Sequence, residues 1–291
     1  MKRCAIVIGI ALLCASIQAQ TAGGKQVEVF SQKIHYIEAG SGANVILLHG
    51  LGGDATNWTL TVPALASKYH VWVPDQIGFG ASDKPLINYR VATLVDFLEG
   101  FCKKTGIDKA TVVGNSLGGW TAMAFALAHP ERVEKLVLVD SAGYSFADAP
   151  VKPTREMMSA LNPSTVHGAK LVLSAIFANK SFVADATAER LFTEHLRKND
   201  GYTIDRFIDS FLRNEDFLDG KLGGIKVPTL VVWGRGDQLI PLASGERFAK
   251  DIPGAQLTVL DGCGHVPQME CAAPFNAVLT KFLGTEMTLN R

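Results

Sequence analysis

The stretch Gly114-Asn115-Ser116-Leu117-Gly118-Gly119 decides the fold of this chain. A short run rich in β-branched residues, 110–113, precedes it, and a segment rich in Ala and Leu, 120–129, follows it. This order predicts a strand, a sharp turn and a helix. A Gly-x-Ser-x-Gly motif in that context is a nucleophile elbow, in which a strained turn lifts the serine hydroxyl above the sheet. Glycines on either side of the serine avoid collisions where strand and helix approach each other. We therefore predict that Ser116 is a catalytic nucleophile.

Length and composition indicate a globular protein with one large α/β domain, or a core with an inserted lobe. The chain has 291 residues, of which 47% are hydrophobic and 19% charged. It carries 28 Lys plus Arg and 28 Asp plus Glu, so its formal net charge is zero. A balanced charge argues against a nucleic-acid partner or an anionic membrane surface. Beyond the N-terminus, no segment is apolar for long enough to span a bilayer.

The N-terminus has the features of an export signal. Lys2 and Arg3 precede an apolar run, 4–15, that is too short for a spanning helix, and Ala19 offers a cleavage site before Gln20. We expect residues 1–20 to be a signal peptide, with a membrane anchor as the alternative. The protein is then exported in bacterial style and is periplasmic or secreted.

Three cysteines remain in the mature part of the chain: Cys102, Cys263 and Cys271. Because the number is odd, at least one thiol is unpaired. An oxidising compartment permits a bridge between Cys263 and Cys271, but their spacing does not decide between a bridge and buried free thiols.

Strand and helix patterns alternate along most of the chain, after an opening hairpin over 26–38. The expected strands are 44–48, 70–73, 110–113, 135–139, 227–234 and 255–260, and the expected helices are 58–67, 89–104, 120–129, 243–251 and 274–283. Such alternation predicts a mostly parallel sheet with right-handed crossovers and a binding site at the carboxyl ends of the strands.

One region lacks strand patterns. Residues 144–222 show helical patterns, at 154–161, 165–178, 186–198 and 202–214. We therefore expect residues 21–143 and 223–291 to form two parts of one core, with 144–222 as a helical insertion between them.

A serine hydroxyl is a weak nucleophile, so it needs a base and an orienting acid. Two loops after the insertion supply them: Asp237 ends Gly234-Arg235-Gly236-Asp237, and His265 ends Gly262-Cys263-Gly264-His265. Because parallel strands end at one edge of the sheet, Ser116, Asp237 and His265 can converge, in the order Ser, Asp, His. Asp140 also follows a strand and is the competing candidate for the acid.

The remaining site residues follow from this triad. His265 acts as general base, Asp237 holds its tautomer, and the backbone N–H groups of Leu51 and Leu117 form the oxyanion hole. We expect Asp75 to be structural and to bond loop N–H groups. Four histidines have no comparable context and are expected to be structural or surface groups: His49, His129, His167 and His195.

From residue 27 to 283 the chain resembles the α/β-hydrolase fold superfamily. The matching segments are His49-Gly50, 75–85, 114–119, 234–237 and Gly264-His265. The resemblance implies a mostly parallel twisted sheet flanked by helices, with the insertion as a helical cap over the pocket. Within the superfamily the chain is similar to a capped group of ester hydrolases, meta-cleavage-product C–C hydrolases, haloalkane dehalogenases and epoxide hydrolases.

Departures from these subfamilies narrow the expected function. Dehalogenases and epoxide hydrolases carry an aspartate where this chain has Ser116. C–C hydrolases typically have a Ser-Gly-Pro-Gly oxyanion loop and a tryptophan after the catalytic histidine, whereas this chain has Leu51-Gly52-Gly53-Asp54 and Val266. We therefore expect an exported serine carboxylesterase that forms an acyl-enzyme on Ser116 from short to medium acyl or aryl esters. The alternatives are a C–C hydrolase of the meta-cleavage type, which Asn115 favours, and a ligand-binding or signalling protein that retains the triad.

The expected partner is a small-molecule ester. We expect Trp58, Phe79, Trp120 and Val266 to contact it. Apolar residues of the cap are further candidates for the lining: Met157, Met158, Leu161, Leu171, Leu173, Ile176 and Phe177. No metal-ligand spacing or phosphate loop is present, and the serine mechanism needs neither a metal nor an organic cofactor.

Overall fold

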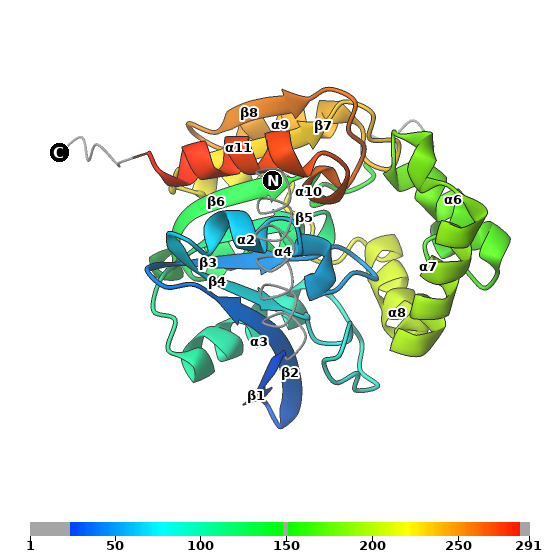
Figure 1. Ribbon diagram of the computed structural model, residues 1–291, viewed down its shortest axis with the longest axis horizontal. Coiled ribbons are helices and arrows are strands. Elements are labelled where there is room, and N and C mark those ends of the chain that lie inside the picture. Colours follow the sequence, from blue (N-terminus) through cyan, green and yellow to red (C-terminus); the bar gives the residue numbers. More distant parts are fainter. Residues whose placement is uncertain (1–23, 148–150, 286–291) are drawn as a thin grey trace, which may run out of the picture.

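A computed structural model of the chain describes residues 24–147 and 151–285, and an eight-stranded sheet lies at its centre (Figure 1). The spatial order of the strands is β1-β2-β4-β3-β5-β6-β7-β8. Their bounds are β1 Lys25–Val29, β2 Gln32–Ala39, β3 Ala43–Leu48, β4 Tyr69–Pro74, β5 Ala110–Asn115, β6 Val133–Val139, β7 Thr229–Gly234 and β8 Gln256–Leu260.

The pairing makes most of the sheet parallel. β1 and β2 form an antiparallel hairpin, β2 pairs antiparallel with β4, and every pair from β4 to β8 is parallel. All residues of β5 and β7 are buried, as expected of central strands covered on both faces. The expected fold class is confirmed. One consequence is that β3, β5, β6, β7 and β8 end at the same edge, where the loops predicted to carry the triad lie.

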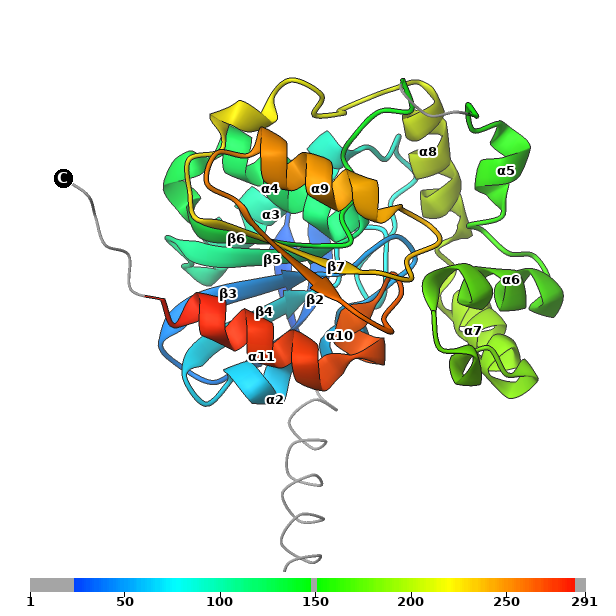
Figure 2. The same ribbon diagram turned by 90° about the horizontal axis from the view of Figure 1, so that it is seen from above.

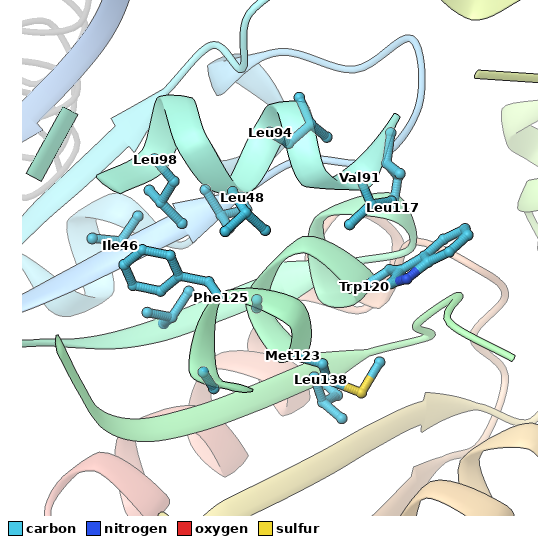
Figure 3. Close-up of a cluster of buried hydrophobic side chains, with 14 of the residues drawn as sticks. Ile46, Leu48, Val91, Leu94, Leu98, Leu117, Trp120, Met123, Phe125 and Leu138 are labelled. Atoms are coloured by element: carbon cyan, nitrogen blue, oxygen red, sulfur yellow. The ribbon is translucent and has the colours of Figure 1, made fainter. Parts of the chain in front are cut away.

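Helices cover both faces of the sheet (Figure 2). One face carries α3, α4 and α9, and the other carries α2, α10 and α11. Their bounds are α2 Val62–Leu65, α3 Val91–Thr105, α4 Leu117–Ala128, α9 Leu242–Asp251, α10 Pro267–Glu270 and α11 Ala272–Leu283. Each face has its own apolar cluster. Figure 3 shows part of the first, with Leu98 of α3 and Phe125 of α4 beside the strands.

Two local expectations need correction. The expected helix over 58–67 is two short pieces, the 3₁₀-helix η1 (Ala55–Trp58) and α2, whose first turn contains Pro63. Proline cannot donate a backbone hydrogen bond, so it suits a new helix start better than a helix interior. The segment between the last expected strand, 255–260, and the last expected helix, 274–283, contains the additional short helix α10, again with a proline, Pro267, at its first position.

Between β6 and β7 the described chain forms helices on one side of the sheet (Figure 1). They are α5 Arg155–Ser159, α6 Val166–Ile176, α7 Asp185–Lys198 and α8 Gly201–Leu212. Helix α8 packs onto the core, where Phe207 stacks on Phe79 at 5.8 Å and Phe211 stacks on Trp120 at 5.4 Å. Helices α6 and α7 lie further out, and we call the region from α5 to α8 the cap.

The predicted signal peptide, 1–20, lies outside the described residues, so it and the export of the protein stay predictions. Within residues 24–147 and 151–285, no helix combines the length and apolar character needed to cross a bilayer.

Candidate active site

Ser116 occupies the sharp turn between β5 and α4. Its φ of 55° and ψ of −119° are strained for a residue with a side chain. A Cβ on Gly114 would lie 2.1 Å from the Gly118 carbonyl oxygen, and a Cβ on Gly118 would lie 2.3 Å from that of Leu48. Both positions therefore require glycine, because strand, turn and helix approach so closely. The backbone of Ser116 donates to the Val139 carbonyl at 3.0 Å, which fixes the turn to β6.

His265 and Asp237 form a buried pair in the loops after β8 and β7. The Nδ1–H of His265 donates to Asp237 Oδ2 at 2.7 Å, since a carboxylate oxygen can only accept. The other oxygen of Asp237 accepts from the backbone N–H of Leu239 at 2.8 Å and of Ile240 at 3.0 Å. With Nδ1 protonated, Nε2 of a neutral imidazole is the basic nitrogen, as a general base for Ser116 requires.

Asp140, the competing acid, is also close to this pair. It is fully buried, and its Oδ1 accepts from the backbone N–H of Gly234 at 2.8 Å. Side-chain ligand atoms of Asp140, Asp237 and His265 all lie within 4.8 Å of one another. The Nδ1–H of His265 nevertheless donates to Asp237 and not to Asp140, which favours Asp237 as the orienting acid.

A disulfide braces the loop that carries His265. Cys263 and Cys271 form a disulfide, with their Cα atoms 6.0 Å apart. Their spacing in the sequence did not decide between this bridge and two free thiols. The loop is also tied to the cap, because the backbone N–H of His265 donates to the Ile176 carbonyl at 2.8 Å. The third cysteine of the described residues, Cys102, is a buried thiol whose pKa burial raises to about 12.

The loop after β3, the predicted oxyanion loop, is held by a buried histidine. His49 donates from Nδ1 to the Gly50 carbonyl at 2.8 Å and accepts at Nε2 from the Gln76 backbone N–H at 3.0 Å. Burial lowers the pKa of His49, which keeps it neutral in this role. Within the described part of the chain, the backbone N–H groups of Leu51 and Leu117 donate to no protein acceptor. Both residues line the cavity described below, so these amides remain candidates for the oxyanion hole.

Asp75 has the structural role expected of it. Its Oδ1 accepts from the Ala55 backbone N–H at 2.7 Å, and its Oδ2 accepts from that of Ala81 at 2.7 Å and from His35 at 2.9 Å. These bonds tie the loop after β4 to the start of η1, which follows the oxyanion loop, and to His35 of β2.

A cavity of about 1240 Å³ lies between the core and the cap. The predicted residues that line it are Ser116, His265, Leu51, Leu117, Trp120, Val266, Met158, Leu161, Leu173, Ile176 and Phe177. Met157 and Leu171 are more than half exposed and do not line it. Asp237 lies behind His265 and is also absent from the lining.

Two predicted substrate contacts, Trp58 and Phe79, are wrong. Both side chains are fully buried and do not line the cavity. Trp58 packs toward Phe275 of α11, and Phe79 packs between His49 and Phe207. Each follows a site loop in sequence, but its side chain points into the core.

The charged residues of α7 are the part of the cavity that sequence reasoning missed. Arg190, Glu194, His195, Arg197 and Lys198 line it from the cap side. Their helical spacing in a charge-rich segment is typical of a solvated face, and only the position of the cap places that face along the cavity wall. His195, expected to be structural or on the surface, lies 3.1 Å from the buried Asp200 carboxylate and also faces the cavity.

Comparison with known proteins identifies the family. The family model described as alpha/beta hydrolase fold matches residues 43–196 and 191–272. The chain belongs to the α/β-hydrolase fold family. This hydrolase is 34% identical over 276 residues to 2-hydroxymuconate semialdehyde hydrolase of Pseudomonas sp. strain CF600, which covers 89% of this chain and 93% of the relative.

Two further relatives are hydrolases of the same kind. A 2-hydroxy-6-oxononadienedioate/2-hydroxy-6-oxononatrienedioate hydrolase of Cupriavidus pinatubonensis is 32% identical over 289 residues, 93% of this chain and 99% of the relative. The solved structure of a meta-cleavage product hydrolase from Pseudomonas fluorescens IP01 superposes with a TM-score of 0.81 at 32% identity, covering 89% of this chain and 97% of that one.

These similarities overturn the expectation of a carboxylic ester hydrolase. The expectation depended on two local departures, the loop over 51–54 and Val266 after the histidine. These three relatives each match 89% or more of the chain and are C–C hydrolases of the meta-cleavage type, and this broader agreement outweighs a few loop residues. The chain is therefore a hydrolase, and its relatives support the first alternative expectation, a C–C hydrolase of the meta-cleavage type.

Proposed function

We propose that this hydrolase cleaves a carbon–carbon bond in a meta-cleavage product, a 2-hydroxy-6-oxo-dienoate, with Ser116 as the nucleophile. The observation that carries the proposal is the similarity to such hydrolases over 89% and 93% of the chain. A substrate of this class has a carbonyl group at one end, a carboxylate at the other, and a conjugated diene between them. To cleave such a substrate, the active site needs a nucleophile and an oxyanion site for the carbonyl, a cation for the carboxylate and an apolar wall for the diene.

The cavity supplies each of these. Arg190 lines it from α7, and no carboxylate of the described residues lies within 4 Å of its guanidinium nitrogens. The neighbouring cations are occupied: Arg197 pairs with Glu194 at 2.6 Å, and Lys198 pairs with Asp54 at 2.7 Å. We therefore assign Arg190 to the substrate carboxylate, since a guanidinium binds a carboxylate through two parallel hydrogen bonds.

The chemistry follows from the core residues. When the dienol converts to its keto form, carbon 5 gains a proton and becomes a workable leaving group, because its electron pair can delocalise onto the 2-oxo group. Ser116 then loses its proton to His265 and attacks the carbonyl at carbon 6, and the amides of Leu51 and Leu117 bind the oxyanion. The bond between carbons 5 and 6 breaks, its electron pair forms the dienolate, and that dienolate takes the proton from His265. Water, deprotonated by His265, finally releases the acid from Ser116.

We also propose that the mature protein works in an oxidising compartment. The predicted signal peptide and the Cys263–Cys271 bridge both support this, because disulfides persist mainly outside the cytosol.

The test follows the dienolate absorbance of 2-hydroxymuconate semialdehyde and of 2-hydroxy-6-oxo-6-phenylhexa-2,4-dienoate. The wild type should bleach at least one of them, and Ser116→Ala should do so at least about 10³-fold more slowly. Ser174→Ala is the matched control, because that hydroxyl is bonded to the Lys170 carbonyl within α6. A wild-type protein that leaves both chromophores intact contradicts the proposal.

A further inference from the structure

Asp140 is a buried carboxyl group that has no direct part in the proposed reaction. Its Oδ1 accepts one hydrogen bond, from Gly234, but its Oδ2 has no partner among the described residues. The side chain is 0% exposed. Its backbone φ of 43° is unusual for a residue other than glycine. A charged oxygen buried in this way, without a donor, would be strongly unfavourable, so its protonation state needs an explanation.

The groups that face Asp140 are mostly negative. Asp237 lies in the loop after β7, His265 in the loop after β8, and Glu270 in α10. Oxygen atoms of Asp140 and Asp237 lie within 4.8 Å of each other. Two carboxylates at this separation in a buried site do not both ionise, and one of them retains a proton.

The hydrogen bonds decide which carboxyl group retains it. Asp237 accepts three, from His265 Nδ1 and from the backbone N–H groups of Leu239 and Ile240. Among the described residues, Asp140 accepts a single hydrogen bond, the one from Gly234. Donors that point at a carboxylate stabilise its ionised form, so Asp237 is the charged member and Asp140 the neutral one. Burial, together with the charge of Asp237, raises the pKa of Asp140 well above its ordinary value, in agreement with this assignment.

We propose that Asp140 is a positioning residue, a protonated carboxylic acid whose Oδ2–H donates a hydrogen bond to the Asp237 carboxylate and so fixes the group that orients His265. The bond satisfies the Oδ2 atom that otherwise has no partner. It also draws charge away from Asp237 and so moderates the basicity of His265. The inference rests on the triad of the proposed function but not on the identity of the substrate.

The experiment uses a fluorophosphonate, which reacts with Ser116 only when His265 is deprotonated and needs no natural substrate. Inactivation rates are measured against pH for wild type, Asp140→Asn and Asp140→Leu. Asparagine keeps an N–H donor without titrating, so it should retain at least about a third of the wild-type rate and the same acid-limb midpoint. Leucine has no donor, so the rate should fall about tenfold or more, and the midpoint should rise because Asp237 holds more charge against the imidazolium. Asp96→Asn, an exposed carboxyl on α3, is the control.

Two results overturn the proposal. If Asp140 is ionised, Asp140→Asn removes a negative charge and lowers the midpoint of the acid limb. If Asp140 only fills space, Asp140→Leu keeps the wild-type rate and profile.

A spectroscopic measurement keeps the inference testable if Asp140→Leu does not fold. The infrared spectrum of the wild type at neutral pH should show a protonated carboxyl C=O band that Asp140→Asn lacks, and absence of that difference also overturns the proposal. A wild type that reacts with the fluorophosphonate but consumes no dienoate refutes the proposed function and leaves the inference about Asp140 standing.

Discussion

The two sides of the cavity are built differently. On the core side, Ser116, Asp237 and His265 each follow a strand, and backbone hydrogen bonds hold their turns, as between Ser116 and Val139. On the cap side, α6 and α7 bury only a small apolar cluster, and that cluster includes Val266 of the core. Loops anchored at a sheet edge hold the catalytic side chains in closely defined positions, whereas a small apolar cluster allows the cap helices to shift relative to the core.

Ion pairs make up part of the attachment of the cap. Lys198 at the end of α7 pairs with Asp54 of the oxyanion loop, and Arg90 before α3 pairs with Asp216 after α8. Through these pairs, electrostatic attraction holds the cap on the core in addition to apolar packing. The difference between the two sides implies that substitutions on the core side act on the chemical step, and that those on the cap side act on substrate binding.

Asp237→Asn should give the largest effect and tests the core side. Asparagine cannot stabilise the imidazolium and favours the wrong tautomer of His265, so kcat should fall about 10⁴-fold with little change in KM. Stopped-flow bleaching of the dienoate measures both constants. Asp261→Asn is the control, because that carboxyl lies in the neighbouring loop but its side chain is 80% exposed. A loss of less than tenfold would mean that another acid orients the histidine.

The core could be predicted from sequence because its signals are local. A strand followed by a glycine-rich turn places Ser116, Asp237 and His265 at one sheet edge, whatever the rest of the chain does. Side-chain direction is not local in the same way. Trp58 and Phe79 follow site loops, yet they face into the core because α11 and α8 pack there.

The cap side could not be predicted for a related reason. The charges of α7 follow a helical pattern that fits a solvated surface equally well. Only the packing of α8 on the core and the approach of Lys198 to Asp54 turn Arg190 and its neighbours toward the cavity. Because the proposed function assigns substrate recognition to these residues, the sequence motifs could predict a hydrolase but not the substrate class that we propose.

Arg190→Met should give the next largest effect and tests the cap side. Loss of a charge-assisted contact to the substrate carboxylate should lower kcat/KM about 100-fold, mainly through KM, with the rate of the fluorophosphonate reaction retained. The comparison is Arg197→Met on the same helix, whose guanidinium is already paired with Glu194 and which should lose far less. Equal losses in the two variants, or a loss that falls on kcat alone, would contradict the assignment of Arg190.

The smallest effect concerns the contact that joins the two sides. Burial alone would raise the pKa of Asp54, but the charge and hydrogen bond of Lys198, with a bond from Thr56, outweigh it and lower the pKa to about 2. Because the folded pKa lies below the ordinary value of 3.8, the pair stabilises the fold by at most about 2 kcal/mol at neutral pH. This contribution is complete well above the unfolded pKa and is lost as pH falls toward about 2.

Asp54→Asn isolates the charge, because asparagine still caps η1 as Asp54 does for the Thr56 backbone N–H. Urea midpoints measured from neutral to acid pH should show a constant gap between wild type and Asp54→Asn above about pH 5, and a narrowing gap below about pH 4. Lys198→Met should show the same pH dependence, since it removes the other half of the pair. If the difference in urea midpoint does not change with pH, the contact between Lys198 and Asp54 acts through packing and not through charge. An ionic attachment of the cap to the oxyanion loop would then no longer distinguish the cap side of the cavity from the core side.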